Sequence, residues 1–278
     1  MCFQSANPGW GLRIAFASGH RAKLAAMTGL AVGAVGLFGL VIGSFLNVVV
    51  YRVPRHESVV TPASRCPGCL TPVSPRDNVP VLSWLWLRGR CRHCGEPISV
   101  RYPLVELLTG VIFAVLAAVR GVDADLVRIL PFAAALVALA AIDLEHHLLP
   151  NRIVAPLAVY GVVAGAIVAT SELPELLIAG AGAFAALLVI ALVAPGGMGM
   201  GDVKLAGTAG LFLGLSVVPA LLMAFLAGSL VGVAMMARHG AGARKRGIPF
   251  GPFLALGSLI ALVAGSQLID LYSDHFLS

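Results

Sequence analysis

Two aspartates, Asp143 and Asp202, stand at positions where a carboxylate is costly to keep. Asp143 ends an apolar stretch, and Asp202 follows the glycine-rich run 195–201 and begins another. An ionisable side chain flanked by membrane-grade apolar sequence is by default a candidate functional residue. Two carboxylates that meet can share one proton, so that the ionised member polarises water while the protonated member hydrogen-bonds a peptide carbonyl. The pair predicts aspartyl-protease chemistry, which needs neither a metal nor a covalent intermediate.

The run before Asp202 predicts a pliable loop that supports a substrate. Gly196, Gly197, Gly199 and Gly201 free the backbone to adopt positive φ and to let a substrate strand approach closely, and Gly199 and Gly201 are the candidates for supporting the substrate. Lys204 follows, and it either supports the site by pairing with a carboxylate or marks one side of the membrane. The run is not a dinucleotide-binding loop, because no strand precedes it and its spacing is Gly-x-Gly-x-Gly. A capping role at a helix start is the alternative for Asp202.

Four of the five cysteines form two pairs, Cys66-Pro-Gly-Cys69 and Cys91-Arg-His-Cys94. Two such knuckles about twenty residues apart have the spacing of a zinc ribbon, in which each turn offers two sulfurs to one tetrahedral ion. Four thiolates leave no open position for water, so this Zn²⁺ would be structural. The alternative is a pair of exchangeable dithiols, as in a membrane thiol oxidoreductase.

Composition indicates the elements that carry these residues. The chain is 59% hydrophobic and 12% charged over 278 residues, with a mean hydropathy of +0.94, which is too little polar surface for a soluble globule. Its apolar stretches are long enough to cross the membrane as helices and lack the alternation of an outer-membrane barrel. We expect an all-α polytopic membrane protein of about eight transmembrane helices. These stretches are 27–50, 103–119, 126–142, 153–170, 174–193, 203–217, 218–237 and 250–271.

The chain divides into four segments. We expect an N-terminal extension over 1–26, a first transmembrane helix over 27–50, a four-cysteine insertion over 51–102 and a seven-helix catalytic domain over 103–278. Either Met1 or Met27 is compatible with the true start. Within the insertion, the apolar segment 78–87 forms either a small core or an interfacial anchor that uses Trp84 and Trp86.

Basic residues predict the orientation. Fourteen of the nineteen Lys and Arg fall on the side of the membrane that carries the insertion, and the richer side is cytoplasmic by the positive-inside rule. Asp143, Asp202 and the cysteines then face the cytoplasm, where disulfides do not persist, and both termini lie outside. The net charge of +6 comes from residues beside apolar spans, so we expect the lipid bilayer as a partner and no nucleic acid.

Several motifs in one order resemble the bacterial type IV prepilin peptidases, which are the leader peptidases and N-methyltransferases of the GxGD aspartyl protease group. The resemblance spans nearly everything from Gly43 onward. Its motifs are Gly43-Ser-Phe-Leu-Asn-Val-Val-Val-Tyr-Arg52, the two cysteine pairs, Arg101-Tyr-Pro-Leu-Val-Glu-Leu-Leu-Thr-Gly110, Asp143 with Leu148-Leu-Pro150, Gly199-Met-Gly-Asp-Val-Lys-Leu205 and Ile248-Pro-Phe-Gly-Pro252.

The resemblance implies that Asp143 and Asp202 are the catalytic pair of an inner-membrane enzyme. Its substrates would be prepilins or pseudopilins of pilus, secretion or DNA-uptake systems, cleaved after a glycine on the cytoplasmic side. It also implies that S-adenosylmethionine methylates the new N-terminal amine. Glu106, an acid within a matched motif, is a candidate for serving that amine, with a helix-packing or boundary role as its alternative. One departure is Asn151, because the family commonly has Leu-Pro-Asp there; Asp143 is present, so proteolysis is still expected.

Overall fold

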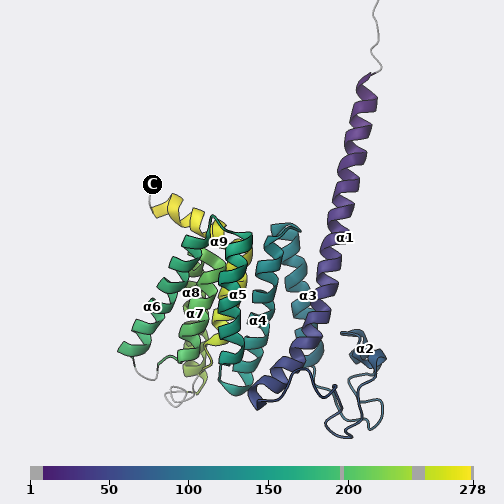
Figure 1. The fold of residues 1–278 in the computed structure, drawn as a ribbon, viewed down its shortest axis with the longest axis vertical. Helices are drawn as coiled ribbons and strands as arrows, with labels where there is room; N and C mark the ends of the chain where they lie inside the picture. The colour runs from purple at the N-terminus through teal and green to yellow at the C-terminus, as the bar shows by residue number, and fades with distance from the viewer. Residues whose placement is uncertain (1–8, 195–196, 240–247, 277–278) are drawn as a thin grey trace, which may run out of the picture.

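The structure is a computed structural model that describes residues 9–194, 197–239 and 248–276, and it is built from helices (Figure 1). In that part of the chain the extended pairing consists of two isolated bridges, Arg65 with Pro72 and Arg90 with Pro97. The helices are α1 (Gly9–Arg52), α2 (Leu82–Trp86), α3 (Arg101–Arg120), α4 (Asp125–His146), α5 (Asn151–Val168), α6 (Leu173–Val193), α7 (Met200–Leu213), α8 (Val217–His239) and α9 (Gly251–Phe276), with short 3₁₀ turns η1 (Val53–Arg55), η2 (Pro75–Asn78) and η3 (Gly214–Ser216).

Six stretches of the described chain are long and apolar enough to cross a membrane. The last of them, Met200–Arg238, has 39 residues, about twice what one crossing needs. It breaks at Gly214, which has a positive φ of 55°, so that α7 and α8 are separate helices. The apolar part of α9 is shorter, Gly251–Gly265. With α7, α8 and α9 counted separately, each predicted stretch corresponds to one helix, and the all-α polytopic membrane fold is confirmed.

The helix boundaries differ from the prediction mainly at the N-terminus. Helix α1 begins at Gly9, well before the predicted start at Met27, and its N-terminal part extends beyond the bundle (Figure 1). The candidate membrane span within it starts at Thr28. The other predicted stretches agree with the helices to within a few residues, because their apolar runs end at Arg, Asp, Pro or Gly.

A polar and aromatic cluster holds α4 against α7. The buried Arg128 of α4 forms an ion pair with Asp125, with 2.7 Å between Nε and Oδ1, and donates a hydrogen bond to the Phe212 carbonyl of α7 at 2.7 Å. The ring of Phe132 stacks on that of Phe212 with 4.3 Å between centroids. Because a buried charge needs both a counterion and hydrogen-bond partners, this cluster makes α4 and α7 neighbours.

Close backbone packing joins α1 to α3. A Cβ added at Gly39 would lie 2.8 Å from Phe113 Cβ, and one added at Gly43 would lie 2.6 Å from Glu106 Cα. Within lipid, helices associate through such close packing and through hydrogen bonds rather than through the hydrophobic effect. The amide Nδ2 of the buried Asn47 supplies one of those bonds, to the Tyr102 carbonyl at 3.1 Å. The two helices therefore form a tightly packed antiparallel pair.

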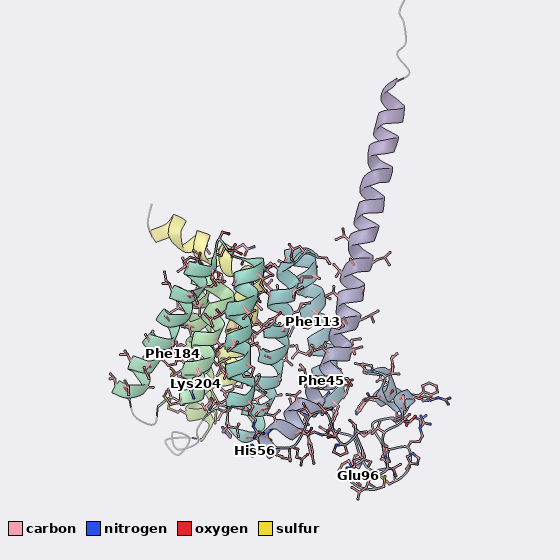
Figure 2. All side chains as sticks on the ribbon, in the orientation of Figure 1. Phe45, His56, Glu96, Phe113, Phe184 and Lys204 are labelled. Carbon is pink, nitrogen blue, oxygen red and sulfur yellow. The ribbon has the colours of Figure 1, made fainter. Side chains whose placement is uncertain are left out.

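The bundle has two distinct ends. The insertion between α1 and α3 lies beside one of them, called here the insertion end, and the C-terminal part of α9 lies at the other, the far end (Figure 1). Lys204 and His56 lie toward the insertion end in Figure 2, with Phe113 further along the bundle. The N-terminal part of α1 points in the direction of the far end. This arrangement is the one expected for an even number of crossings.

Candidate active site

The structure brings the two predicted catalytic acids to the same end of the bundle. Asp143 lies one turn before the end of α4, and Asp202 lies in the first turn of α7, so both are at the insertion end. Their exposed fractions are 5% and 9%. The matched depth inferred from loop charges is thus reproduced by the packing of α4 against α7.

Each carboxylate accepts a hydrogen bond from a backbone N–H at the start of a helix. Gly251, the first residue of α9, donates to Asp143 Oδ2 at 2.9 Å, and Gly199, the residue before α7, donates to Asp202 Oδ2 at 3.3 Å. A helix start favours negative charge because its N–H groups carry partial positive charge. The capping role considered for Asp202 is therefore present, but a carboxylate has about four acceptor positions, which leaves capacity for water or substrate.

Leu149 and two glycines set the spacing of the site. The turn that joins α4 to α5 carries Leu149 against α7, where a Cβ added at Gly201 would lie 2.9 Å from Leu149 Cβ. A Cβ added at Gly251 would lie 2.6 Å from Asp143 Oδ2 and 3.1 Å from Leu149 Cδ2. Three backbone segments thus converge on the acids at distances that exclude even a methyl group.

The prediction of positive φ in the glycine run was wrong for Gly197, Gly199 and Gly201, because none of these described residues has a positive φ. Gly199 has a φ of −77° and Gly201 lies within the helical range of α7. What they supply is room: a Cβ added at Gly199 would lie 3.2 Å from Asp202 Oδ2. Pro195 and Gly196 of the same run lie outside the described residues.

Lys204 bonds to an amide, and none of the ion pairs among the described residues includes it. Its Nζ donates to Asn151 Oδ1, the first residue of α5, at 3.1 Å. Both residues line a cavity of about 500 Å³ between α5, α6 and α7, whose wall includes Gly180, Gly207 and Thr208. Neither aspartate lines this cavity, so it is separate from the acid pair. The acceptor for Lys204 is therefore the neutral amide of Asn151, at the position where the family that the sequence resembles commonly has an aspartate.

Glu106 is buried between α3 and the insertion, with 8% of its surface exposed. Its Oε2 accepts a hydrogen bond from the backbone N–H of Val81 at 2.7 Å, just before α2. The packing role considered for Glu106 is therefore real, since this bond ties the insertion to a membrane helix. One bond uses only part of the acceptor capacity of a carboxylate.

The four predicted metal ligands form one cluster. The Sγ atoms of Cys66, Cys69, Cys91 and Cys94 all lie within 4.8 Å of one another. The Cys66–Cys94 distance is 3.7 Å and the Cys69–Cys91 distance is 4.0 Å. Ideal tetrahedral coordination with Zn–S bonds of about 2.3 Å places sulfurs about 3.8 Å apart. The donor set therefore fits Zn²⁺, and each distance given pairs a sulfur of one knuckle with a sulfur of the other.

The thiols do not ionise equally. Hydrogen bonds from the side chain and backbone of Thr71 lower the pKa of Cys69 to about 6, and the backbone N–H groups of Cys94 and His93 lower that of Cys91. Although a backbone hydrogen bond from Glu96 favours its thiolate, burial and the three neighbouring thiols raise the pKa of Cys94 to about 12. Negative charge accumulates as the cluster ionises, and a bound cation would offset it.

The apolar segment of the insertion divides between the two roles considered for it. The Trp84 indole donates from Nε1 to the Ile98 carbonyl at 3.0 Å and packs over Gly89, so Trp84 belongs to the small core. Trp86 is 84% exposed, and its neighbours Leu82 and Leu85 are 63% and 58% exposed. That pattern fits the interfacial alternative for this side of α2.

Sequence reasoning did not single out Gly251 or Leu149 as parts of the site. Both stand in motifs quoted for the resemblance, Pro-Phe-Gly-Pro and Leu-Leu-Pro. A signal for Gly251 existed: a Gly-Pro pair after a loop marks a helix start, and a helix start at the insertion end is a ready partner for a carboxylate.

Comparisons with known proteins agree with this arrangement. The model of the Bacterial Peptidase A24 N-terminal domain matches residues 37–119, which include the cysteine cluster, and the model of the Type IV leader peptidase family matches residues 130–237, which include both acids. No solved structure gives a significant match.

Curated relatives match over most of their length. A protein of Aeromonas hydrophila is 37% identical over 276 residues, covering 87% of this chain and 94% of the relative. One of Bacillus subtilis is 34% identical, covering 85% and 95%, and one of Myxococcus xanthus is 41% identical, covering 74% and 64%. All three carry the name Prepilin leader peptidase/N-methyltransferase. Identities of 37% and 34% with nearly the full length of the first two relatives establish that the chain belongs to the type IV leader peptidase family.

Proposed function

We propose that this chain is a membrane aspartyl endopeptidase that removes the basic leader of type IV prepilins or pseudopilins and then N-methylates the new N-terminal residue. The observation that carries the proposal is the pair of buried acids, Asp143 and Asp202, at one end of the helical bundle. The names of the relatives support both activities. They do not favour a membrane thiol oxidoreductase.

In the peptidase reaction, one carboxylate is ionised and the other is protonated. The ionised member accepts a proton from water as the water oxygen attacks the carbonyl carbon of the scissile bond, and the protonated member stabilises the carbonyl oxygen. The tetrahedral intermediate then collapses, the C–N bond breaks, and the leaving amine takes the proton that the first carboxylate accepted from water. The N–H groups of Gly199 and Gly251 hold the two carboxylates in place. Gly201 gives the loop its close approach to Leu149.

The active site and the insertion face the cytoplasm in this proposal, and the membrane is the inner membrane. Support comes from the excess of Lys and Arg on the insertion side of the spans. A basic leader would then stay on the side where it is made, while the apolar helix that follows it lies in the bilayer. Lys204 supports the start of α5 through Asn151. The partners are thus the lipid bilayer and a prepilin.

The methyl step needs S-adenosylmethionine, which supplies an electrophilic methyl group on a sulfonium. The amine loses a proton, its lone pair forms the N–C bond, and the S–C bond breaks with its electrons going to sulfur. Zn²⁺ has a structural role in this proposal: it joins the two cysteine knuckles into one unit.

Co-expression with a prepilin, read by the mass of the substrate, tests the acid pair. We expect Asp143→Asn and Asp202→Asn each to slow cleavage at least about a hundred-fold, because each removes one proton-transfer group. Glu145→Gln is the matched control: it removes an acid two residues after Asp143, on the partly exposed end of α4, and should process the prepilin normally. Cleavage at the normal rate by either aspartate variant, with normal membrane insertion, would show that the assignment of the pair is wrong.

A further inference from the structure

Asn47 has a buried oxygen without a hydrogen-bond partner among the described residues. Its side chain is 2% exposed, and its Nδ2 donates to the carbonyls of Gly43 at 3.3 Å and Tyr102 at 3.1 Å. Two carbonyl acceptors fix which end of the amide faces them, because only the NH₂ group can donate. The Oδ1 atom is thereby turned away from both, and it makes no hydrogen bond to any residue that the structure describes. A buried acceptor left in this state costs roughly 1–3 kcal/mol, which is unusual without a ligand to satisfy it.

A second acceptor, Glu106, lies within one helical turn of the Asn47 amide. Gly43 of α1 packs against the Glu106 backbone, and Asn47 reaches Tyr102, one turn before Glu106 on α3. Glu106 accepts one hydrogen bond, from Val81, and none of the ion pairs found among the described residues includes it. Beside the seam between α1 and α3 there are thus a carboxylate without an ion-pair partner and an amide oxygen without a hydrogen-bond donor, as far as the described residues extend.

This pair lies at the same end of the bundle as the catalytic acids. Arg101 at the start of α3 forms an ion pair with Glu145 of α4, two residues after Asp143. The Arg101 guanidinium also lies over the Tyr102 ring, 5.3 Å from its centroid. These contacts link the α1–α3 seam to the end of α4 that carries Asp143. A chain end released at the acid pair would therefore have a second polar site nearby.

We propose that Asn47 and Glu106 bind the protonated amine of the newly released N-terminus and present it for methyl transfer. The inference rests on the proposed function and assigns the methyl step to a place in the fold. The Glu106 carboxylate pairs with the ammonium and accepts the proton that it must lose, while Asn47 Oδ1 accepts a second N–H. The neutral amine then forms the N–C bond to the methyl of S-adenosylmethionine, the S–C bond breaks, and the thioether leaves with the electron pair.

A binding experiment tests the site without any turnover. Two synthetic peptides that begin with an apolar residue and continue as an apolar helix, one with a free amine and one N-acetylated, are titrated into the purified protein. We expect the peptide with the free amine to bind about ten-fold more tightly than the acetylated one, because a buried ion pair typically contributes a difference in affinity of this size. In Glu106→Gln the two peptides should bind alike. That variant keeps an oxygen for the Val81 N–H, so it removes the charge and retains the structural bond.

Matched variants separate the site from general packing. Asn47→Leu should also reduce the preference for the free amine. Thr109→Val changes a fully buried hydroxyl of the same helix, which bonds only to Val105 of its own turn, and should keep the preference. Equal binding of both peptides to the wild-type protein, or an unchanged preference in Glu106→Gln, would overturn the inference.

Processing of a co-expressed prepilin provides the second arm. We expect the product cleaved by Glu106→Gln to be methylated about a hundred-fold more slowly, as for the loss of a general base. A wild-type protein that does not cleave would contradict the proposed function, and the peptide preference would still report on the amine site. A normally methylated product from Glu106→Gln would count against the inference alone.

Discussion

At the scale of single residues, the candidate site consists of two acids whose backbone partners come from different helices. Asp143 stands near the C-terminal end of α4, where the helix dipole disfavours a negative charge. The start of α9 offsets this, because Gly251 donates its N–H to the same carboxylate. Asp202 needs no such help, since it lies in the first turn of its own helix. The two acids are thus supported unequally, and Asp143 depends on a residue more than a hundred positions away.

Gly251→Ala tests that dependence. Its new methyl group would lie 2.6 Å from Asp143 Oδ2, so either the carboxylate or the start of α9 has to move. We expect cleavage of a co-expressed prepilin to fall about a hundred-fold, as for a misplaced catalytic group. Gly182→Ala in α6 is the control, because nothing lies within 4 Å of the added carbon. Normal cleavage by Gly251→Ala would mean that the Asp143 carboxylate has no need of this position.

At the scale of elements, the insertion is a small unit with its own fold. Two bridges close the two cysteine knuckles, and Arg92 clamps Asp77 with 2.6 Å between Nη2 and Oδ1. Its core is too small to be stable alone, a condition that structural metals commonly remedy. The Val81–Glu106 hydrogen bond is its anchor to α3. Loss of the metal would therefore loosen the insertion more than the bundle.

Metal content checks this account of the insertion. We expect about one zinc per chain in the wild-type protein. The Cys66→Ser variant should lose this zinc, and residues 51–102 should then become sensitive to limited proteolysis. Cys2→Ser is the matched control and should keep the metal. If the purified wild-type protein contained no metal and the four insertion thiols reacted immediately with a thiol reagent, the dithiol alternative would be supported instead.

Sequence reasoning reached different depths for different elements. Apolar runs bounded by charged residues, Pro or Gly predicted each membrane helix, since length and hydropathy decide a crossing. The spacing of the cysteines predicted the metal-ligand cluster, because the two ligands of each pair lie in one short turn of the chain. Contacts such as Gly251 with Asp143, or Asn47 with Tyr102, join residues from separate helices. They follow from how helices pack, which one sequence's pattern of apolar residues does not specify.

At the scale of the whole molecule, topology is what makes the acids a pair. Helix α4 runs toward the insertion end and α7 runs away from it, so a residue at the end of one meets a residue at the start of the other (Figure 1). The same alternation places the α3–α4 connection at the far end. One labelling experiment can therefore report the side of the membrane for both ends of the bundle.

That experiment uses a membrane-impermeant thiol reagent on cells with an intact inner membrane. In a Cys2→Ser background the four insertion cysteines should stay unlabelled in intact cells. After the cells are lysed and a chelator is added to remove the metal, the same cysteines should react with the reagent. Val122→Cys, added to this background, places a thiol at an exposed position of the α3–α4 connection and should react in intact cells. If the insertion cysteines react in intact cells and Val122→Cys does not, the orientation is reversed. The acids would then face away from the compartment in which a prepilin keeps its basic leader.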